Sequence, residues 1–181
     1  MSRPAARNRE SIQLVARELF TQKGVQRTSL QDIADRLGIT KPALYHHFRS
    51  RDDLVRSIIA PLIDEGEEFV AAHERRRKAN RAAPRELLEG YFDFHYRHRA
   101  DLVLVVAELT TVADLGLIDA MLGWRDRLSR LVFGRAPSLE QSTRAVIAFG
   151  GMQDCVLQFP DTPADALKQA TVEGAMAALG L

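Results

Sequence analysis

Residues 30–49, LQDIADRLGITKPALYHHFR, decide how the first part of this chain folds. Two short amphipathic segments flank Gly38, a residue that can turn the backbone tightly between two helices. Ala34 is small enough for the two helices to approach closely, and the apolar Ile39 is expected to fill the corner between them. A small residue, a glycine four positions on and an apolar residue six further on, Leu44, have the spacing of a helix-turn-helix motif. The stretch therefore predicts two short helices joined by a tight turn.

The second helix of this motif has an apolar face and an exposed face. Leu44 and Phe48 lie one turn apart, so both are expected to point into the core. Successive residues of a helix are rotated by about 100°, which directs Pro42 and His46 outward and places His47 on a flank. The outward face has no carboxylate, as expected of a surface that meets phosphates and base edges. Metal binding by the two histidines is disfavoured, because adjacent helix positions diverge and cannot converge on one ion.

Helical spacing and capping residues predict about nine helices and no strand along the chain, so the expected fold class is all-α. Thr28 with Gln31, or Ser29 with Asp32, is expected to cap the second helix. Pro61 lies inside the fourth helix, where it removes a backbone hydrogen bond and is expected to kink the helix. The expected helices cover residues 10–23, 28–37, 40–48, 51–78, 85–98, 101–113, 117–133, 138–159 and 163–179.

The composition and the charge are those of an ordinary globular protein. Of 181 residues, 46% are hydrophobic and 27% are charged. No apolar run reaches the ~18–20 residues that a membrane span needs. The N-terminus lacks the apolar core of a signal peptide, and the single cysteine, Cys155, cannot form an internal disulfide. We therefore expect a cytoplasmic protein without a membrane partner.

The first 51 residues contain ten Lys and Arg against four Asp and Glu, although the net charge is +1. Either this basic part meets a polyanion, or solvated charges are segregated there by chance.

A family resemblance extends over residues 9–56. The run TSLQDIADRLGITKPALYHHFRSRDDLV resembles the DNA-binding domain of the tetracycline-repressor (TetR) family, whose hallmark is the segment L-Y-x-H-F, here Leu44 to Phe48. The rest of the chain is similar to that family only in its layout of helices. The resemblance implies a helix-turn-helix DNA-binding domain in residues 1–50 and a helical ligand-binding and dimerisation domain in residues 51–181.

The resemblance also implies which residues meet double-stranded DNA. Because Ala43 has no hydrogen-bonding group, base recognition is expected to rest on Lys41, His46, Gln31 and apolar contact with thymine methyl groups. The implied contacts are base edges for Lys41, Pro42, Ala43 and His46, phosphates for Tyr45, His47 and Arg51, and the backbone or groove edge for Ser29 and Gln31, with Thr40 at the start of the helix completing the set.

A single helix-turn-helix binds DNA weakly, so a homodimer that reads a palindromic operator is expected. The N-terminal Arg3, Arg7 and Arg9 either reach the DNA as an arm or belong to a disordered tail. Small residues in the last two helices leave smooth surfaces for close helix packing, either against a partner or within the same chain. The expected dimer interface consists of Gly150, Gly151, Leu157, Leu167, Ala170, Gly174, Ala177 and Ala178.

The central helices carry aromatic side chains with a few polar atoms, which is what a small-molecule cavity needs. The alternative is a filled core without a cavity. An effector, whose identity the sequence leaves unknown, would shift the long helix beginning at Arg51, with Pro61 as a compliant point, and change the separation of two recognition helices. The expected pocket is lined by Leu88, Tyr91, Phe92, His95, Met121, Trp124, Leu128, Gln153 and Asp154.

Other chemistry finds weaker support in the residue pattern. Asp93, His95 and His98 are candidate metal ligands, with Glu108 or His73 adding a further one, but hydrogen-bonded histidines at the edge of a core are commoner. No nucleophile lies beside a base and an orienting acid. We therefore expect no metal, no cofactor and no enzymatic activity, and predict a ligand-responsive repressor. The alternative is a DNA-binding regulator that is constitutive or is controlled by a protein partner.

Overall fold

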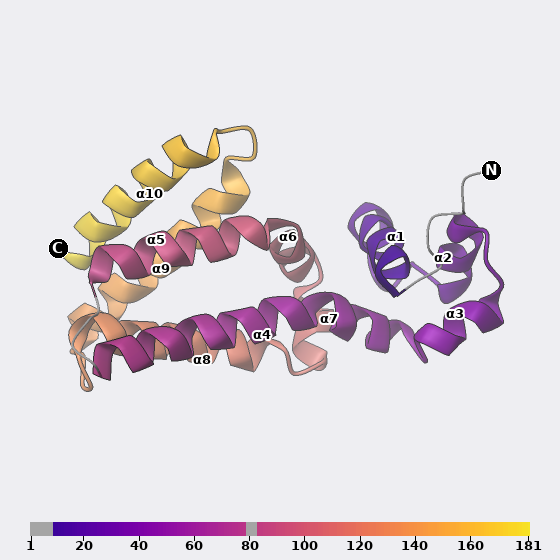
Figure 1. Ribbon diagram of the computed structural model, residues 1–181, viewed down its shortest axis with the longest axis horizontal. Helices are drawn as coiled ribbons and strands as arrows, with labels where there is room; N and C mark the ends of the chain where they lie inside the picture. Colours follow the sequence, from indigo (N-terminus) through magenta and orange to yellow (C-terminus); the bar gives the residue numbers. More distant parts are fainter. Residues whose placement is uncertain (1–8, 79–82) are drawn as a thin grey trace. The chain divides into compact units, whose positions relative to one another are not determined.

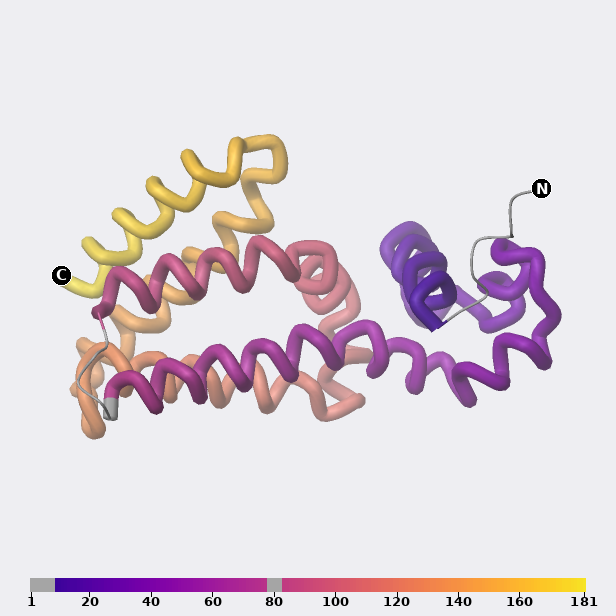
Figure 2. Tube along the Cα trace, in the orientation of Figure 1, coloured from indigo at the N-terminus to yellow at the C-terminus, as the bar shows by residue number. Residues whose placement is uncertain are grey.

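The computed structural model describes residues 9–78 and 83–181, and these form an all-α fold without strands (Figures 1 and 2). The expected fold class is therefore confirmed. In the described residues, no helix is both long and apolar enough to cross a membrane. The helices are α1 (Arg9–Lys23), α2 (Leu30–Leu37), α3 (Lys41–His47), α4 (Arg51–Lys78), α5 (Pro84–Arg97), α6 (Arg99–Ala107), α7 (Leu109–Asp114), α8 (Ile118–Phe133), α9 (Leu139–Gln158) and α10 (Ala164–Leu179).

One expected helix is two helices in the structure. The helix predicted over residues 101–113 is replaced by α6 and α7, and Glu108 between them has φ −119° and ψ 33°, outside the helical region. The Glu108 carboxylate accepts a hydrogen bond from the backbone N–H of Val25 at 2.8 Å, a tertiary contact that helical periodicity cannot reveal. The described part of the chain therefore has ten helices rather than nine.

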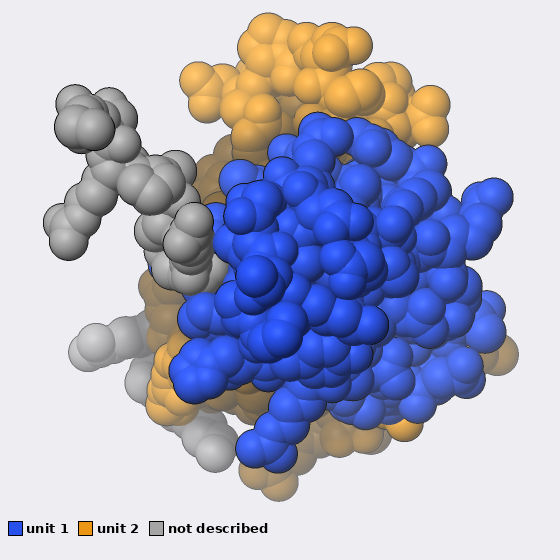
Figure 3. Space-filling view, turned by 90° about the vertical axis from the view of Figure 1, so that its right-hand side faces the viewer, with its two compact units in different colours: residues 1–61, 103–117 blue, residues 62–102, 118–181 orange. Residues whose placement is uncertain are grey.

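The chain divides into two compact units, which are coloured separately in Figure 3. α4 and α6 each contribute to both units. Unit 1 contains the predicted DNA-binding region together with the start of α4, and Pro61 lies inside α4, which continues past it. The kink expected at Pro61 stays a prediction. The two units are Met1–Pro61 with Val103–Leu117 (unit 1) and Leu62–Leu102 with Ile118–Leu181 (unit 2).

The core of unit 1 is formed mainly by α1, α2, α3 and the first turns of α4. Its apolar side chains are almost completely removed from water, and each large one contributes about 1.5–3 kcal/mol on burial. This core keeps α3 in place with its opposite face outward. The core side chains include Ile12, Ala16, Phe20, Val25, Ile33, Ala34, Leu44, Phe48, Leu54, Val55, Ile58 and Ile59.

A reciprocal cap begins α2. The Ser29 hydroxyl accepts from the backbone N–H of Asp32 at 3.1 Å, and the Asp32 carboxylate accepts from the backbone N–H of Ser29 at 2.8 Å. The Ser29 N–H, and then Lys23 at 2.9 Å, lower the pKa of Asp32 to about 2. The other cap that the sequence allows does not form, because the Thr28 hydroxyl is buried and donates to a backbone carbonyl at 2.8 Å.

Unit 2 packs α5, α8, α9 and α10 around an aromatic core together with the C-terminal part of α4. At Gly66, α4 lies so close to α8 that a Cβ atom would overlap the Trp124 indole ring. The Trp124 Nε1 donates to the Glu67 carboxylate at 3.3 Å, which holds the ring across the α4 backbone. Close packing of these two helices therefore requires a glycine at residue 66.

Candidate nucleic-acid interface and effector site

The exposed face of α3 is the candidate nucleic-acid interface. Leu44 and Phe48 are completely buried, whereas Tyr45 keeps 44% of its surface exposed. The inward and outward orientations predicted from helical rotation, including that of His46, are confirmed. The candidate interface consists of the exposed Lys41, Pro42, Ala43, Tyr45 and His46 and the half-buried His47.

The turn before α3 sets its position. Gly38 has φ 62°, and its backbone N–H reaches the carbonyls at the end of α2. A side chain at this left-handed conformation would be strained, so glycine is required here. Thr40 begins α3 by accepting a hydrogen bond on its hydroxyl from the backbone N–H of Ala43 at 3.3 Å. The expected DNA contact of Thr40 stays a prediction, since its observed role is capping.

The face of α3 offers cationic and hydrogen-bonding groups without internal counter-charges. The Lys41 Nζ lies 5.8 Å from the centroid of the Tyr45 ring, within the range of a cation–π contact. The rings of His46 and His47 pack edge to face at 5.7 Å. No salt bridge among the described residues involves Lys41, His46 or His47. This face is therefore suited to the negatively charged backbone of a nucleic acid.

Some of the expected DNA-binding residues hold the motif together. Arg51 donates to the backbone carbonyl of Gln26 at 3.0 Å and to its side-chain oxygen at 2.7 Å. Gln31 donates to the Asp35 carboxylate at 2.6 Å, and Ser29 caps α2. The structure thus places these side chains at the edges of the motif with protein partners. Their contacts with DNA stay predictions.

Arg9 belongs to a helix rather than to a disordered tail, and its contact with DNA stays a prediction. It is the first residue of α1, and its Nη1 donates to the backbone carbonyl of His47 at 3.1 Å. Its guanidinium group lies 4.4 Å from the centroid of the Phe48 ring. Arg9 therefore supports the C-terminal end of α3. Arg3 and Arg7 lie outside the described residues.

Within unit 1, hydrogen bonds connect the loop between α1 and α2 to the corner between α6 and α7. Besides binding the Val25 N–H, the Glu108 carboxylate accepts from the Thr111 hydroxyl at 3.3 Å. The Gln26 side chain donates to the same hydroxyl at 3.4 Å. Since Arg51 holds Gln26, one hydrogen-bonded network joins α4, this loop and the α6–α7 corner. Sequence reasoning missed this role of Glu108, which it considered only as a metal ligand.

The comparison with protein families covers the same part of the chain. Residues 12–58 match the family described as bacterial regulatory proteins, tetR family. Residues 12–58 of this chain therefore form a TetR-family domain. Helices α2 and α3 lie within the matched residues.

Individual relatives agree with this assignment. The HTH-type transcriptional repressor KstR2 of Mycolicibacterium smegmatis is 31% identical over 123 residues, or 65% of this chain and 57% of the relative. The HTH-type transcriptional activator FasR of the same species is 32% identical over 91 residues, or 50% of this chain and 42% of the relative. The chain thus spans about half the length of the curated relatives it matches. A transcriptional regulator from Aquifex aeolicus VF5 shares the fold, with a TM-score of 0.71 and 23% identity over 93% of this chain and 98% of that one.

The expected effector pocket lies in unit 2, where aromatic rings pack on one another. The ring centroids of Tyr91 and His95 are 4.0 Å apart, and those of Tyr91 and Phe149 are 5.0 Å apart. Burial raises the pKa of Tyr91 and lowers the pKa of His95 to about 4, so both are neutral at pH 7. The pocket itself stays a prediction. Leu88, Tyr91, Phe92, His95, Trp124 and Leu128 are buried, Met121 and Gln153 are half-buried, and Asp154 is exposed.

The candidate metal ligands have separate partners. His95 donates from Nδ1 to a backbone carbonyl at 2.9 Å, and Asp93 accepts from the Lys168 ammonium group at 2.6 Å. His98 lies with its Nε2 3.0 Å from a Glu65 carboxylate oxygen. In the described part of the chain, no group of three His, Cys, Asp or Glu side chains is placed to hold a metal ion. His95 is thus a hydrogen-bonded histidine of the core, the commoner of the two alternatives for this residue.

The expected dimer face lies on α9 and α10, which pack against each other. Leu167 is buried inside unit 2, so it packs within its own chain. Val146 and Ile147 are 53% and 64% exposed, and sequence reasoning missed them although their helical spacing to the α9 glycines was visible. Gly150 and Leu157 are half-buried, as is Ala178, while Gly151, Ala170, Gly174 and Ala177 are exposed. Gly150, Gly151 and Gly174 on this face all have open space at the Cβ position.

Proposed function

We propose that this chain is a ligand-responsive transcriptional regulator of the cytoplasm. It would act as a repressor that binds a palindromic operator as a homodimer and is released by a small-molecule effector. The observation that carries the proposal is the exposed, carboxylate-free face of α3 on a domain that matches the TetR family. The longer of the two matches to relatives is to a repressor, which supports repression over activation.

DNA recognition would place α3 in the major groove. Lys41 and His46 would donate hydrogen bonds to base edges, and Tyr45 and His47 would contact phosphates on the flanks. Pro42 and Ala43 would allow close approach to thymine methyl groups. The exposed positions of Lys41 and His46 on α3 support their assignment to base edges. Arg51, in contrast, already donates to Gln26 within the motif.

Selection of bound duplexes from random DNA by the full chain tests this function directly. A palindromic sequence should be enriched. Lys41→Ala should then reduce affinity for that sequence by about 1–3 kcal/mol and relax its sequence preference, whereas Tyr45→Ala should weaken all duplexes about equally. Arg85→Ala, which removes a cation paired with Glu173 in unit 2, is the matched control. Unchanged binding in both α3 variants would refute the assignment.

Coupling to an effector would pass through Glu108. An effector that displaces α6 would move the Glu108 carboxylate and, with it, the loop between α1 and α2. Glu108→Gln keeps the shape but removes the charge, and should weaken operator binding about three- to tenfold, because a charge-assisted hydrogen bond to Val25 is lost. Glu18→Gln, on the exposed side of α1, is the control. Equal operator affinity of both variants in fluorescence anisotropy would argue against this route.

A second candidate is a DNA-binding regulator that is constitutive or is controlled by a protein partner. The dense packing of Tyr91, His95 and Phe149 favours it, because a filled core leaves no room for an effector there. Screening metabolites for release of the operator distinguishes the two: a constitutive regulator responds to none of them.

A further inference from the structure

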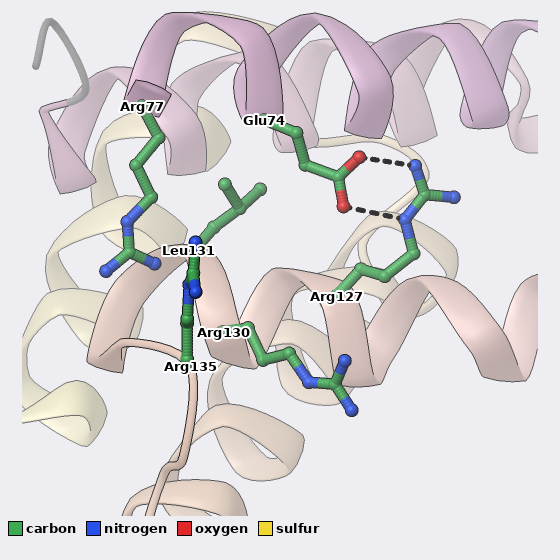
Figure 4. A pocket seen from close by; sticks show the side chains of 6 residues that line it. All are labelled: Glu74, Arg77, Arg127, Arg130, Leu131 and Arg135. Carbon is green, nitrogen blue, oxygen red and sulfur yellow. Dashed lines mark hydrogen bonds and ion pairs between the residues drawn. The ribbon is translucent and has the colours of Figure 1, made fainter. Parts of the chain in front are cut away.

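A hollow of about 430 Å³ lies in unit 2 near the C-terminal ends of α4 and α8 (Figure 4). Four arginines and a single glutamate line it, so its walls carry a large excess of positive charge. None of the residues of the expected effector pocket contributes to its walls. The lining residues are Glu74, Arg77, Arg127, Arg130, Leu131 and Arg135.

Two of these arginines have their charge balanced by carboxylates of the protein. Arg127 contacts Glu74 at 2.8 Å and Glu67 at 2.7 Å, and these two carboxylates raise its pKa. Arg130 contacts its helix neighbour Asp126 at 2.7 Å. These pairs keep both side chains in place at the edge of the hollow.

The other two arginines, Arg77 and Arg135, form no salt bridge with any described residue. Figure 4 shows Arg77 extending from α4 and Arg135 extending from the segment after α8, both beside the hollow. A Cβ atom on Gly134 would lie 3.8 Å from the Arg77 Nη2, so this guanidinium lies against the turn that precedes Arg135. Two cations that share a small hollow repel each other, and an anion between them would offset this repulsion.

Attraction to helix dipoles is the simpler explanation for basic residues here, because helices carry partial negative charge at their C-terminal ends. It accounts for Arg77, in the last turn of α4. Arg135 lies two residues beyond the end of α8 at Phe133, outside the last turn of the helix. Attraction to the dipoles does not explain why side chains from different elements meet around the apolar Leu131.

A second hollow, of about 200 Å³, shares Arg77 and Leu131 with the first. Most of its other lining residues are apolar in type, polar atoms contribute at least as much of its surface as apolar atoms, and no carboxylate lines it. A hollow lined mainly by arginines and a hollow lined mainly by apolar residues with His73 therefore share Arg77 and Leu131. Together they reach the volume range of small-molecule sites, about 300–1,000 Å³. The walls of the second hollow are His73, Arg77, Ala83, Pro84, Leu87, Leu131 and Val132.

We propose that the two hollows bind an amphiphilic anion. Its carboxylate or phosphate group would lie between Arg77 and Arg135, and its apolar part would pack on Leu131 and Leu87. Guanidinium groups pair with either anion through two parallel hydrogen bonds, which favours arginine over lysine at such a site. The role of this ligand as the effector of the regulator rests on the proposed function. The existence of the binding site does not rest on it.

Calorimetric titration of the full chain with octyl phosphate, octanoate and inorganic phosphate tests the site. Saturable binding of octyl phosphate or octanoate is expected, with inorganic phosphate binding at least about tenfold more weakly because it lacks the apolar part. Arg77→Gln and Arg135→Gln should each weaken binding of the amphiphile about tenfold or more. Arg75→Gln is the matched control, since Arg75 belongs to the same basic run but pairs with Glu68 at 2.6 Å and lies outside both hollows.

Three results would overturn the proposal: no saturable binding of either amphiphile, an equal loss in Arg75→Gln, or equal affinity for inorganic phosphate. The relative affinities of octyl phosphate and octanoate identify the head group. Adding octyl phosphate to the complex with selected DNA separates this proposal from the proposed function. If octyl phosphate binds at Arg77 and Arg135 without releasing the DNA, the binding site is supported and its regulatory role is refuted. Failure to select any DNA sequence refutes the proposed function while the titration still reports on the site.

Discussion

At the scale of single residues, Asp32 shows how one carboxylate stabilises the start of the recognition motif. It accepts the Ser29 N–H and lies 2.9 Å from Lys23, and these partners favour its charged form. Its pKa is therefore lowered from 3.8 to about 2 on folding. A lowered pKa means that the stabilisation is complete above the unfolded value and is lost as the pH falls toward the folded value.

Asp32→Asn is accordingly expected to lower the melting temperature at pH 6 and to matter less in acid. The difference from the unmodified chain should shrink as the pH falls from about 4 toward about 2, because the native carboxylate then becomes protonated. Thermal melts followed by circular dichroism at several pH values measure it. Asp35→Asn, at an exposed position of the same helix, is the control. A pH-independent difference would contradict the linkage.

Residue orientations on α3 were predictable, but side-chain partners were not. The 100° rotation between residues places His46 outward and Leu44 inward whatever the rest of the fold. Arg9 and Arg51, in contrast, looked like free cations for DNA. Their partners are the His47 carbonyl and Gln26, which only the packing of α1, α3 and α4 brings near them.

At the scale of elements, the contact between α4 and α8 depends on a missing side chain. Gly66 faces the Trp124 ring, whereas Gly123, one residue before that tryptophan, has open space at its Cβ position. The two helical glycines therefore form a matched pair for testing the packing.

Gly66→Ala should destabilise the chain by about 1–3 kcal/mol, because the added methyl group forces the indole out of its place. Gly123→Ala should instead stabilise the chain by up to about 1 kcal/mol, since alanine is the better helix former. Urea unfolding followed by Trp124 fluorescence measures both. Similar effects of the two substitutions would show that the Gly66 contact is not tight.

Helix boundaries were predictable where a capping residue marks them and not where a tertiary contact does. Ser138 and Gln141 form the reciprocal cap expected at the start of α9. The break between α6 and α7 has no such signal, because Glu108 contacts Val25, a residue far away in the sequence.

At the scale of the whole molecule, the exposed face of α9 and α10 is the proposed dimer contact. Ile147 and Gly151 lie one turn apart on α9, and Ala170, Gly174 and Ala177 lie along α10. Small side chains allow close helix packing, while the exposed Ile147 supplies apolar area.

Ile147→Asp is expected to convert a dimer into a monomer in light scattering at micromolar concentration, because it places a charge in the apolar contact. It should also weaken operator binding about tenfold or more, since two linked recognition helices bind more tightly than one. Leu122→Asp changes a similarly exposed residue of α8 and should leave the dimer intact. A monomeric unmodified chain, or a dimeric Ile147→Asp variant, would rule out this interface.

The sequence by itself determined the all-α class, the helix-turn-helix and the outward face of α3, because each depends on residues within a few helical turns of one another. Tertiary structure alone decided the network at Glu108, the need for glycine at residue 66 and the meeting of Arg77 with Arg135. These features join residues that are distant in the chain. Only the packing of helices determines which of the many possible distant pairs come together.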